Sequence, residues 1–123
     1  MAYIPDGTEW FLAELVQEIR IEGEDGKELH AILVLIQASE PETAYSKALD
    51  WGKARELDFT NTEGRPVKIR FLGLSSLNIV YEPLIDGAEL IDSTYGEATP
   101  ELLGRLLVEK DQLNVFRPIT PLF

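Results

Sequence analysis

Apolar and polar residues alternate along the first segment of the chain, and a period of two is typical of β-strands. One face of this segment is apolar apart from Gln17, and the opposite face carries charged residues. The apolar positions are Phe11, Ala13, Leu15, Ile19 and Ile21, and the charged positions are Glu14, Glu18 and Arg20. Helical spacing also fits Leu12, Leu15, Val16 and Ile19, but the β-branched end and the following "GEDGKE" favour a strand. Asp25-Gly26 predicts a tight hairpin turn into the next strand.

The second predicted strand, Leu29 to Ala38, is apolar on both faces. Leu29, Ala31, Leu33 and Leu35 point to one side, and Ile32, Val34 and Ile36 point to the other. A strand that is buried on both sides usually lies in the centre of its sheet. We therefore expect a central strand, covered above and below. If this segment lay at the edge of the sheet with one side in solvent, the argument would fail.

The stretch "SEPETAYSKALDWGKARE" predicts a helix. Ser39 and Glu42 have the spacing of a capping box, and Pro41 suits the first turn. One stripe of the helix holds Ala44, Ala48, Trp51 and Arg55, with Tyr45, Leu49 and Gly52 beside it. The small residues would let the helix lie close to a sheet, and we expect Trp51 to pack in the core.

The stretch "FTNTEGRPVKIRFLG" combines a glycine with basic residues, which raises the question of a phosphate-binding loop. Such a loop needs several glycines, a Lys followed by Ser or Thr, and an immediate helix. Here a single glycine follows Glu63, and a proline and a strand come next. We therefore predict a turn between a short strand and a longer one, in which Val67, Ile69 and Phe71 face the core.

The rest of the chain predicts two more strands and a second helix. A bend at Gly73–Ser76 precedes the strand "LNIVYEPL", where Tyr81 is expected in the core, and "AELIDSTY" returns after Asp86-Gly87. Thr99 and Pro100 open the helix "TPELLGRLLVEK". The fold class is α+β, in the order β-β-α-β-β-β-α. It has a mostly antiparallel sheet of about five strands, one helix packed across it and a second, C-terminal helix. We expect one globular domain over residues 1–123, with a core at about 9–91 and an apolar helix and tail at 99–123.

Three pieces of the sequence resemble the bacterial domain of unknown function 4288 family. They are "EWFLAELVQEIRIEGEDGK", "LVLIQASEPETAYSKALDWGKARE" and "FTNTEGRPVKIRFLGLSSLNIVYEPLIDGAEL". Together they span residues 9–91. The resemblance implies the boundaries of the fold, but it brings no activity and no catalytic residues.

The composition narrows the classes of partner. Lys and Arg total 11 against 22 Asp and Glu, so the net charge is −11. A surface this acidic repels phosphate backbones, which disfavours binding to nucleic acid or to anionic membranes. There is no cysteine, no apolar stretch of membrane-spanning length, and no basic region followed by an apolar run at the start. We expect a cytoplasmic protein.

Candidate chemistry is sparse. His30 is the only histidine and lacks the carboxylate spacing of a metal site, so we interpret it as a strand-edge residue. The acidic turn of Glu22, Glu24, Asp25 and Glu28 lacks the ladder of a calcium loop. Glu14 and Glu18 are expected to pair across strands with Arg20, Lys68 or Arg70. We predict no catalytic, metal-binding or cofactor-binding residues and no cofactor, and an enzyme is the less favoured class.

The favoured function is a non-catalytic protein-interaction domain that self-associates, with a dimer as the favoured homo-oligomer. Two short helices leave too little material to cover both faces of an apolar strand, and a second copy could cover the rest. The candidate interface residues are Trp10, Ile32, Val34, Ile36, Tyr45, Phe116 and Phe123. One alternative is an acidic, immunity-type inhibitor of a basic protein, which needs a contiguous acidic patch. Another is a small enzyme or ligand-binding domain, which needs a pocket with convergent polar groups.

Overall fold

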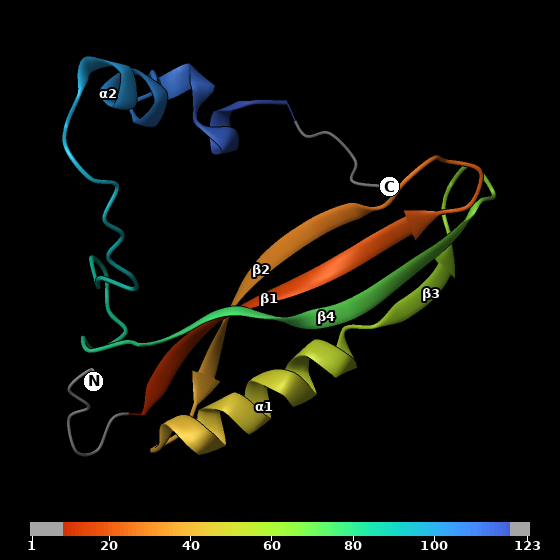
Figure 1. Ribbon diagram of the computed structural model, residues 1–123, viewed down its shortest axis with the longest axis horizontal. Coiled ribbons are helices and arrows are strands. Elements are labelled where there is room, and N and C mark those ends of the chain that lie inside the picture. Colours follow the sequence, from red (N-terminus) through yellow and green to blue (C-terminus); the bar gives the residue numbers. More distant parts are fainter. Residues whose placement is uncertain (1–8, 119–123) are drawn as a thin grey trace. The chain divides into compact units, whose positions relative to one another are not determined.

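A computed structural model describes residues 9–118 of the chain (Figure 1). Its contacts divide the chain into two units, Met1–Ile91 and Asp92–Phe123, and each is described by itself. The expectation of one domain over the whole chain stays a prediction.

The first unit is built on one antiparallel, curled sheet. Its four strands are β1 (Trp10–Ile21), β2 (Glu28–Gln37), β3 (Leu57–Thr60) and β4 (Pro66–Ile79). They lie in the order β2-β1-β4-β3, so the two long strands β1 and β4 form the centre (Figure 1). The predicted hairpin turn forms, and Gly26 has the positive φ of 80° that such a turn requires.

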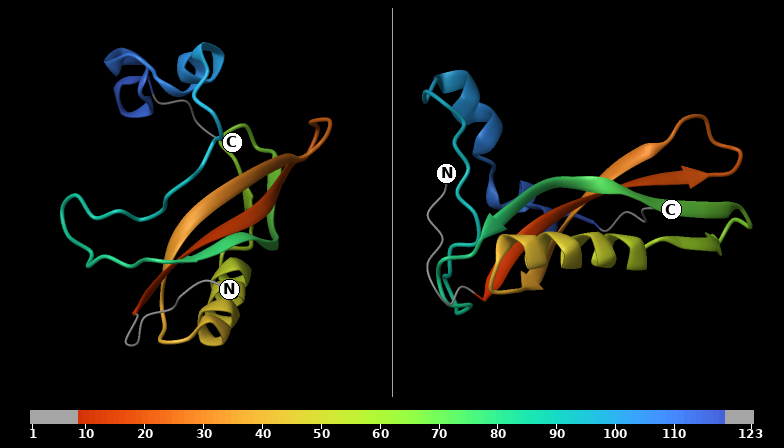
Figure 2. Two further views of the ribbon diagram at one scale, coloured as in Figure 1. Left: turned by 60° about the vertical axis from the view of Figure 1, so that its left-hand side comes forward. Right: turned by 60° about the horizontal axis from the view of Figure 1, so that its bottom comes forward.

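Helix α1 (Pro41–Ala54) lies along one face of this sheet, against β1, β2 and β4 (Figure 2). The face against α1 is called the helix face here, and the opposite one the second face. The register of β1 against β4 pairs Ala13 with Leu77 and Ile19 with Ile69, so these residues all lie on the helix face. The apolar side of β1 predicted from its period of two is therefore confirmed, including the buried Gln17.

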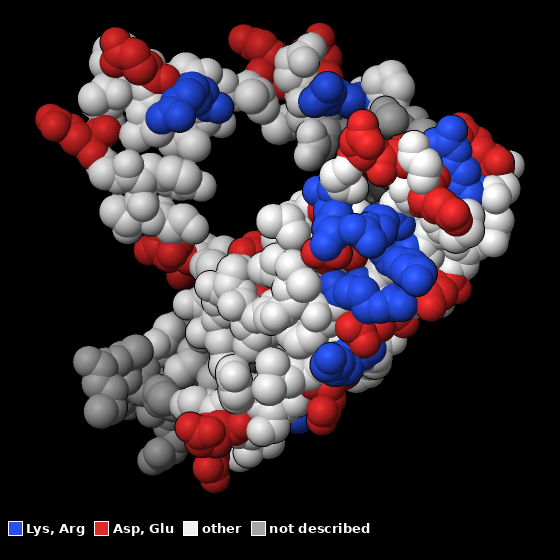
Figure 3. Space-filling model, turned by 45° about the vertical axis from the view of Figure 1, so that its right-hand side comes forward, with Lys and Arg blue, Asp and Glu red and all other residues white. Residues whose placement is uncertain are grey.

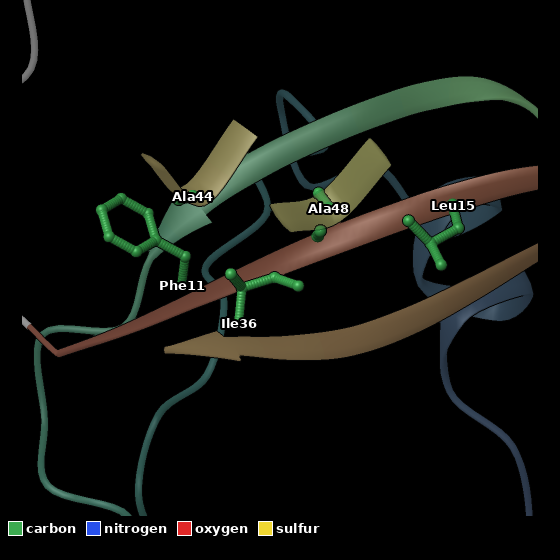
Figure 4. Packing of buried hydrophobic residues seen from close by; sticks show 6 residues of the cluster. Phe11, Leu15, Ile36, Ala44 and Ala48 are labelled. Carbon is green, nitrogen blue, oxygen red and sulfur yellow. The ribbon is translucent and has the colours of Figure 1, made fainter. Parts of the chain in front are cut away.

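Small residues on α1 and large ones on the strands form the main core. Phe11 and Leu15 of β1 and Ile36 of β2 pack with Ala44 and Ala48 of α1 (Figure 4). A second cluster, Ile19, Val67 and Ile69, lies farther along the sheet. The short side chains of α1 let the helix approach the sheet closely, as the sequence predicts.

Two details of the expected α1 differ from the structure. Its N-cap is Glu40 without a side-chain capping bond, so the capping box of Ser39 and Glu42 is wrong, although Pro41 does open the helix. The predicted core position of Trp51 is also wrong, because its side chain is 52% exposed. Burial instead follows Ala44, Ala48 and Gly52, and this stripe places Trp51 on its outer flank.

The sheet has four strands in the described residues instead of about five. The two strands expected after the Thr62–Arg65 turn are one continuous strand, β4. The bend expected near Gly73 is instead a pair of irregularities in the pairing of β4 with β1. Residues 88–95 form no strand, and Tyr81 is 59% exposed, so its predicted core position is wrong. The α+β class and the antiparallel pairing are confirmed.

The second unit contains helix α2 (Pro100–Leu106) and two short 3₁₀ turns, η1 (Lys110–Gln112) and η2 (Asn114–Phe116). Thr99 caps α2 as predicted, because its hydroxyl oxygen accepts a hydrogen bond from the Leu102 N–H at 3.2 Å. The helix ends at Leu106, earlier than the leucine-rich stretch predicts, and none of its residues is buried.

Candidate interaction surface

Strand β2 lies at the edge of the sheet, so its predicted central position is wrong. Apolar residues on both of its faces suggested a strand covered above and below. In the structure α1 covers the helix face alone, so β2 is not a central strand that a second copy must cover. As an edge strand, β2 exposes side chains on one face and backbone groups along one side.

The second face of β2 carries a row of exposed apolar side chains, which we call the leucine row. It consists of Leu29, Ala31, Leu33 and Leu35. The exposed fractions are 67% for Leu29, 52% for Leu33 and 42% for Leu35. Exposure decreases toward the end of the strand where Leu35 lies opposite the buried Leu12. Exposed large side chains that follow one another along a strand mark a binding surface more strongly than scattered ones do.

The backbone of the same residues faces away from the sheet. The Ala38 N–H donates to the Glu9 carbonyl at 2.8 Å, so Ala38 faces β1. Because the hydrogen-bonding direction alternates along a strand, Ile36, Val34, Ile32 and His30 also face β1. The N–H and C=O groups of the leucine row therefore point to the free edge of β2. No strand adjoins that edge in the described part of the chain.

A polar contact lies at each end of the stretch of β2 whose backbone groups point outward. At one end, the Lys47 ammonium of α1 donates to the Gln37 carbonyl, so this outward acceptor is already used. At the other end, Glu28 accepts from or pairs with His30 at 3.1 Å, and the hairpin turn follows. His30 lies in this edge strand, as the prediction of a strand-edge residue requires. Between these ends, no charged residue lies from Leu29 to Gln37 apart from His30 when protonated.

The opposite edge of the sheet is protected. Strand β3 has four residues, and its Asp58 carboxylate accepts a hydrogen bond from the Arg70 guanidinium at 2.7 Å. This hydrogen bond and the charge of Arg70 hold the pKa of Asp58 below its ordinary value of 3.8. Short, charged edge strands resist pairing with other chains, whereas β2 has ten residues and few such features.

Charged side chains on the second face pair differently from the prediction. Glu18 lies opposite Arg70 in the register, but its ion pair is with Lys27 at 3.3 Å. Glu14 accepts a hydrogen bond from the Ser75 hydroxyl. In the space-filling view, Lys and Arg side chains gather in a patch that Asp and Glu border (Figure 3). The visible face is therefore mixed in charge.

The glycine turn between β3 and β4 is a structural element. The Asn61 side-chain oxygen accepts hydrogen bonds from the N–H groups of Glu63 at 3.0 Å and Arg65 at 2.9 Å, and Gly64 has a φ of 81°. Asn61 occupies these N–H groups itself, which leaves them unavailable to a phosphate. The prediction of a turn is confirmed. The sequence did not indicate that the Asn61 side chain holds this turn together.

The hairpin tip between β1 and β2 encloses a small hollow. Its lining includes Ile19, Ile21, Glu24, Asp25 and Lys27, and its volume is about 160 Å³. Small-molecule sites are typically larger, roughly 300–1,000 Å³. No group of three or more metal-ligating side chains is found in residues 9–118. The tip therefore offers little to a cofactor or a substrate.

The predicted interface residues fall in different places. Trp10 is half-buried at the start of β1, and Ile32 and Val34 are half-buried on the helix face of β2. Ile36 is fully buried in the core and has no side-chain surface for a partner. Tyr45 is exposed on α1, and Phe116 is exposed in the second unit beside the Lys110 ammonium. Phe123 lies outside the described residues.

Comparison with known proteins identifies a family but no characterised relative. The longest helix in residues 9–118 is too short and too polar to cross a membrane. Neither the curated proteins nor the solved structures include a match to this chain. The family model for the domain of unknown function 4288 matches residues 10–92, which covers the sheet, α1 and the segment that follows β4. The chain therefore belongs to the domain of unknown function 4288 family.

Proposed function

We propose that this chain is a non-catalytic protein-interaction domain that self-associates through β2. The observation that carries the proposal is the leucine row on an unprotected edge strand. Its apolar side chains and its outward backbone groups belong to the same four residues. A partner strand that pairs with the edge would satisfy the backbone groups and at the same time cover the flank of the side chains.

Association through this surface has an energetic reason. Burying a whole leucine side chain is worth about 1.5–3 kcal/mol, so flanking a side chain that is half exposed contributes at most roughly 1 kcal/mol. Leu29, Leu33 and Leu35 would each contribute in both copies of a dimer. Backbone hydrogen bonds add geometric specificity to this apolar contact. A cytoplasmic location is part of the proposal.

The alternatives have less support. An immunity-type inhibitor needs a contiguous acidic patch, and the face in Figure 3 intersperses acidic residues with Lys and Arg. A ligand-binding domain or an enzyme needs convergent polar groups in a pocket, and the hollow at the hairpin tip is small and lined mainly by its own turn. Neither alternative uses the leucine row.

A matched pair of variants tests the proposal. Leu33 in β2 and Leu57 in β3 are both 52% exposed and both belong to edge strands. We expect the wild-type mass to rise from monomer toward dimer with concentration in light scattering. Leu33→Lys is expected to weaken the association at least tenfold, because it places a charge directly beside apolar side chains of the other copy. Leu57→Lys should leave it unchanged.

Circular dichroism must show the same secondary structure in the three proteins, so that a loss of association does not reflect unfolding. A wild-type protein that stays monomeric at every concentration would refute self-association. Equal association of wild type and Leu33→Lys would refute the role of the leucine row.

A further inference from the structure

The geometry points to a specific arrangement, in which two copies of β2 pair antiparallel about a twofold axis at Ile32. This inference rests on the proposed self-association and states how it occurs. The pairing would join two four-stranded sheets into one continuous sheet of eight strands. The occupant of the free edge is a second copy of this chain.

The length of the free edge sets the register. The outward backbone groups from Leu29 to Leu35 are unpaired in the sheet, whereas the Gln37 carbonyl is already bonded to Lys47. A twofold pairing that uses all the available groups must be centred on the middle of this stretch. The midpoint is Ile32, which pairs Leu29 with Leu35 of the other copy and Ala31 with Leu33. Any shift along the strand would leave outward groups unpaired or would meet Gln37.

The alternation of the backbone agrees with this centre. Ile32 faces β1, so its own N–H and C=O groups are already in the sheet, and the two Ile32 residues would form a non-hydrogen-bonded pair. Directly opposite residues of such a pair have Cα atoms about 4.5 Å apart. The odd-numbered residues on either side would supply the hydrogen bonds.

A second copy suits this edge because the strand is complementary to itself. In the proposed register, Glu28 would lie opposite residue 36, which is Ile36, so the two Glu28 carboxylates stay far apart. His30 would lie opposite Val34 and would not meet its symmetry mate. The leucine rows of both copies stay on the same face of the joined sheet and lie side by side. Residues 28–36 of the two copies therefore oppose no like charges, and apolar side chains are adjacent.

Single cysteines test the register, because the natural chain contains no cysteine. Ile32→Cys is expected to form a disulfide between two copies under mild oxidation, since a distance of about 4.5 Å lies in the range that a disulfide spans. Leu35→Cys is the matched control on the same strand. Its symmetry mate would lie six residues away, about 20 Å, so it should not cross-link. Ser46→Cys, exposed on α1, measures random collision.

The readout is the fraction of covalent dimer at equal concentration, with sedimentation of each reduced protein in parallel. We expect at least a tenfold excess of cross-linked Ile32→Cys over both controls. If the reduced proteins are dimeric but Leu35→Cys links and Ile32→Cys does not, the proposed pairing is wrong while self-association stands. If every reduced protein and the wild type are monomeric, both proposals fail.

Discussion

At the scale of single residues, the close approach of α1 to Phe71 of the sheet depends on Gly52. A Cβ atom at this position would lie less than 3.0 Å from the ring of Phe71 on β4. A glycine inside a helix normally costs about 1 kcal/mol relative to alanine. The chain accepts that cost here because no side chain fits between the helix and the ring.

Gly52→Ala should therefore destabilise the fold, although alanine favours helices. Overpacking typically costs about 1–3 kcal/mol, which exceeds the gain in helix propensity. We expect the free energy of unfolding to decrease by roughly 1 kcal/mol in chemical denaturation. Gly104→Ala is the matched control, because Gly104 is also helical and a Cβ there meets nothing within 4 Å. That variant should be neutral or slightly more stable.

A shorter side chain at Phe71 checks the cause. In a Phe71→Leu background, Gly52→Ala should cost much less, because the ring that it meets is gone. An equal cost in both backgrounds would show that the ring is not the obstacle.

At the scale of elements, much of the first unit can be predicted from the sequence. The period of two along β1 gives its two faces correctly, and Asp25-Gly26 and Glu63-Gly64 mark the turns. The small residues of α1 also indicate the close packing of the helix. These features are local, because each depends on neighbouring residues and on backbone conformations that few residue types adopt.

The position of β2 could not be predicted in the same way. Leu29, Leu33 and Leu35 are as apolar as core residues, and the sequence alone does not show that β4 takes the place beside β1. A strand prepared to meet a partner resembles a strand buried within its own fold. The candidate surface was thus missed at these three residues, while the half-buried Ile32 and Val34 were named.

The opposite edge gives a pH-dependent prediction. The Arg70 hydrogen bond lowers the pKa of Asp58 in the folded chain, so the folded state binds a proton there less readily than the unfolded state. The pair of Asp58 and Arg70 therefore stabilises the folded state fully above pH 3.8, the ordinary pKa of an aspartate. This stabilisation is lost as the pH falls through the lower pKa that Asp58 has in the folded chain. Asp58→Asn should melt at a slightly lower temperature than wild type at neutral pH.

The two melting temperatures should converge as the pH is lowered below 3.8 in thermal unfolding followed by circular dichroism. Glu63→Gln serves as the control for loss of a carboxylate, because its contact with Arg65 is long, at 3.9 Å. A difference between wild type and Asp58→Asn that grows toward acid pH would contradict the assigned sign.

At the scale of the whole molecule, the account depends on an asymmetry between the two edges of one sheet. The β3 edge is short and charged, and the β2 edge is long and apolar. A net charge of −11 keeps separate copies apart at long range, so association requires a local contact that outweighs the repulsion. We therefore expect added salt to strengthen the dimer by screening.

Amide hydrogen exchange on the wild-type protein, measured by NMR across a range of concentrations, tests the central claim most directly. The N–H groups of Leu29, Ala31, Leu33 and Leu35 should exchange fast in dilute solution and become protected as the concentration rises. Those of Ile32 and Val34, which face β1, should be protected throughout. Fast exchange of the four outward amides at every concentration would contradict pairing of β2 with a second copy. Protection of these four amides in a dilute sample that sedimentation shows to be monomeric would contradict the free edge itself.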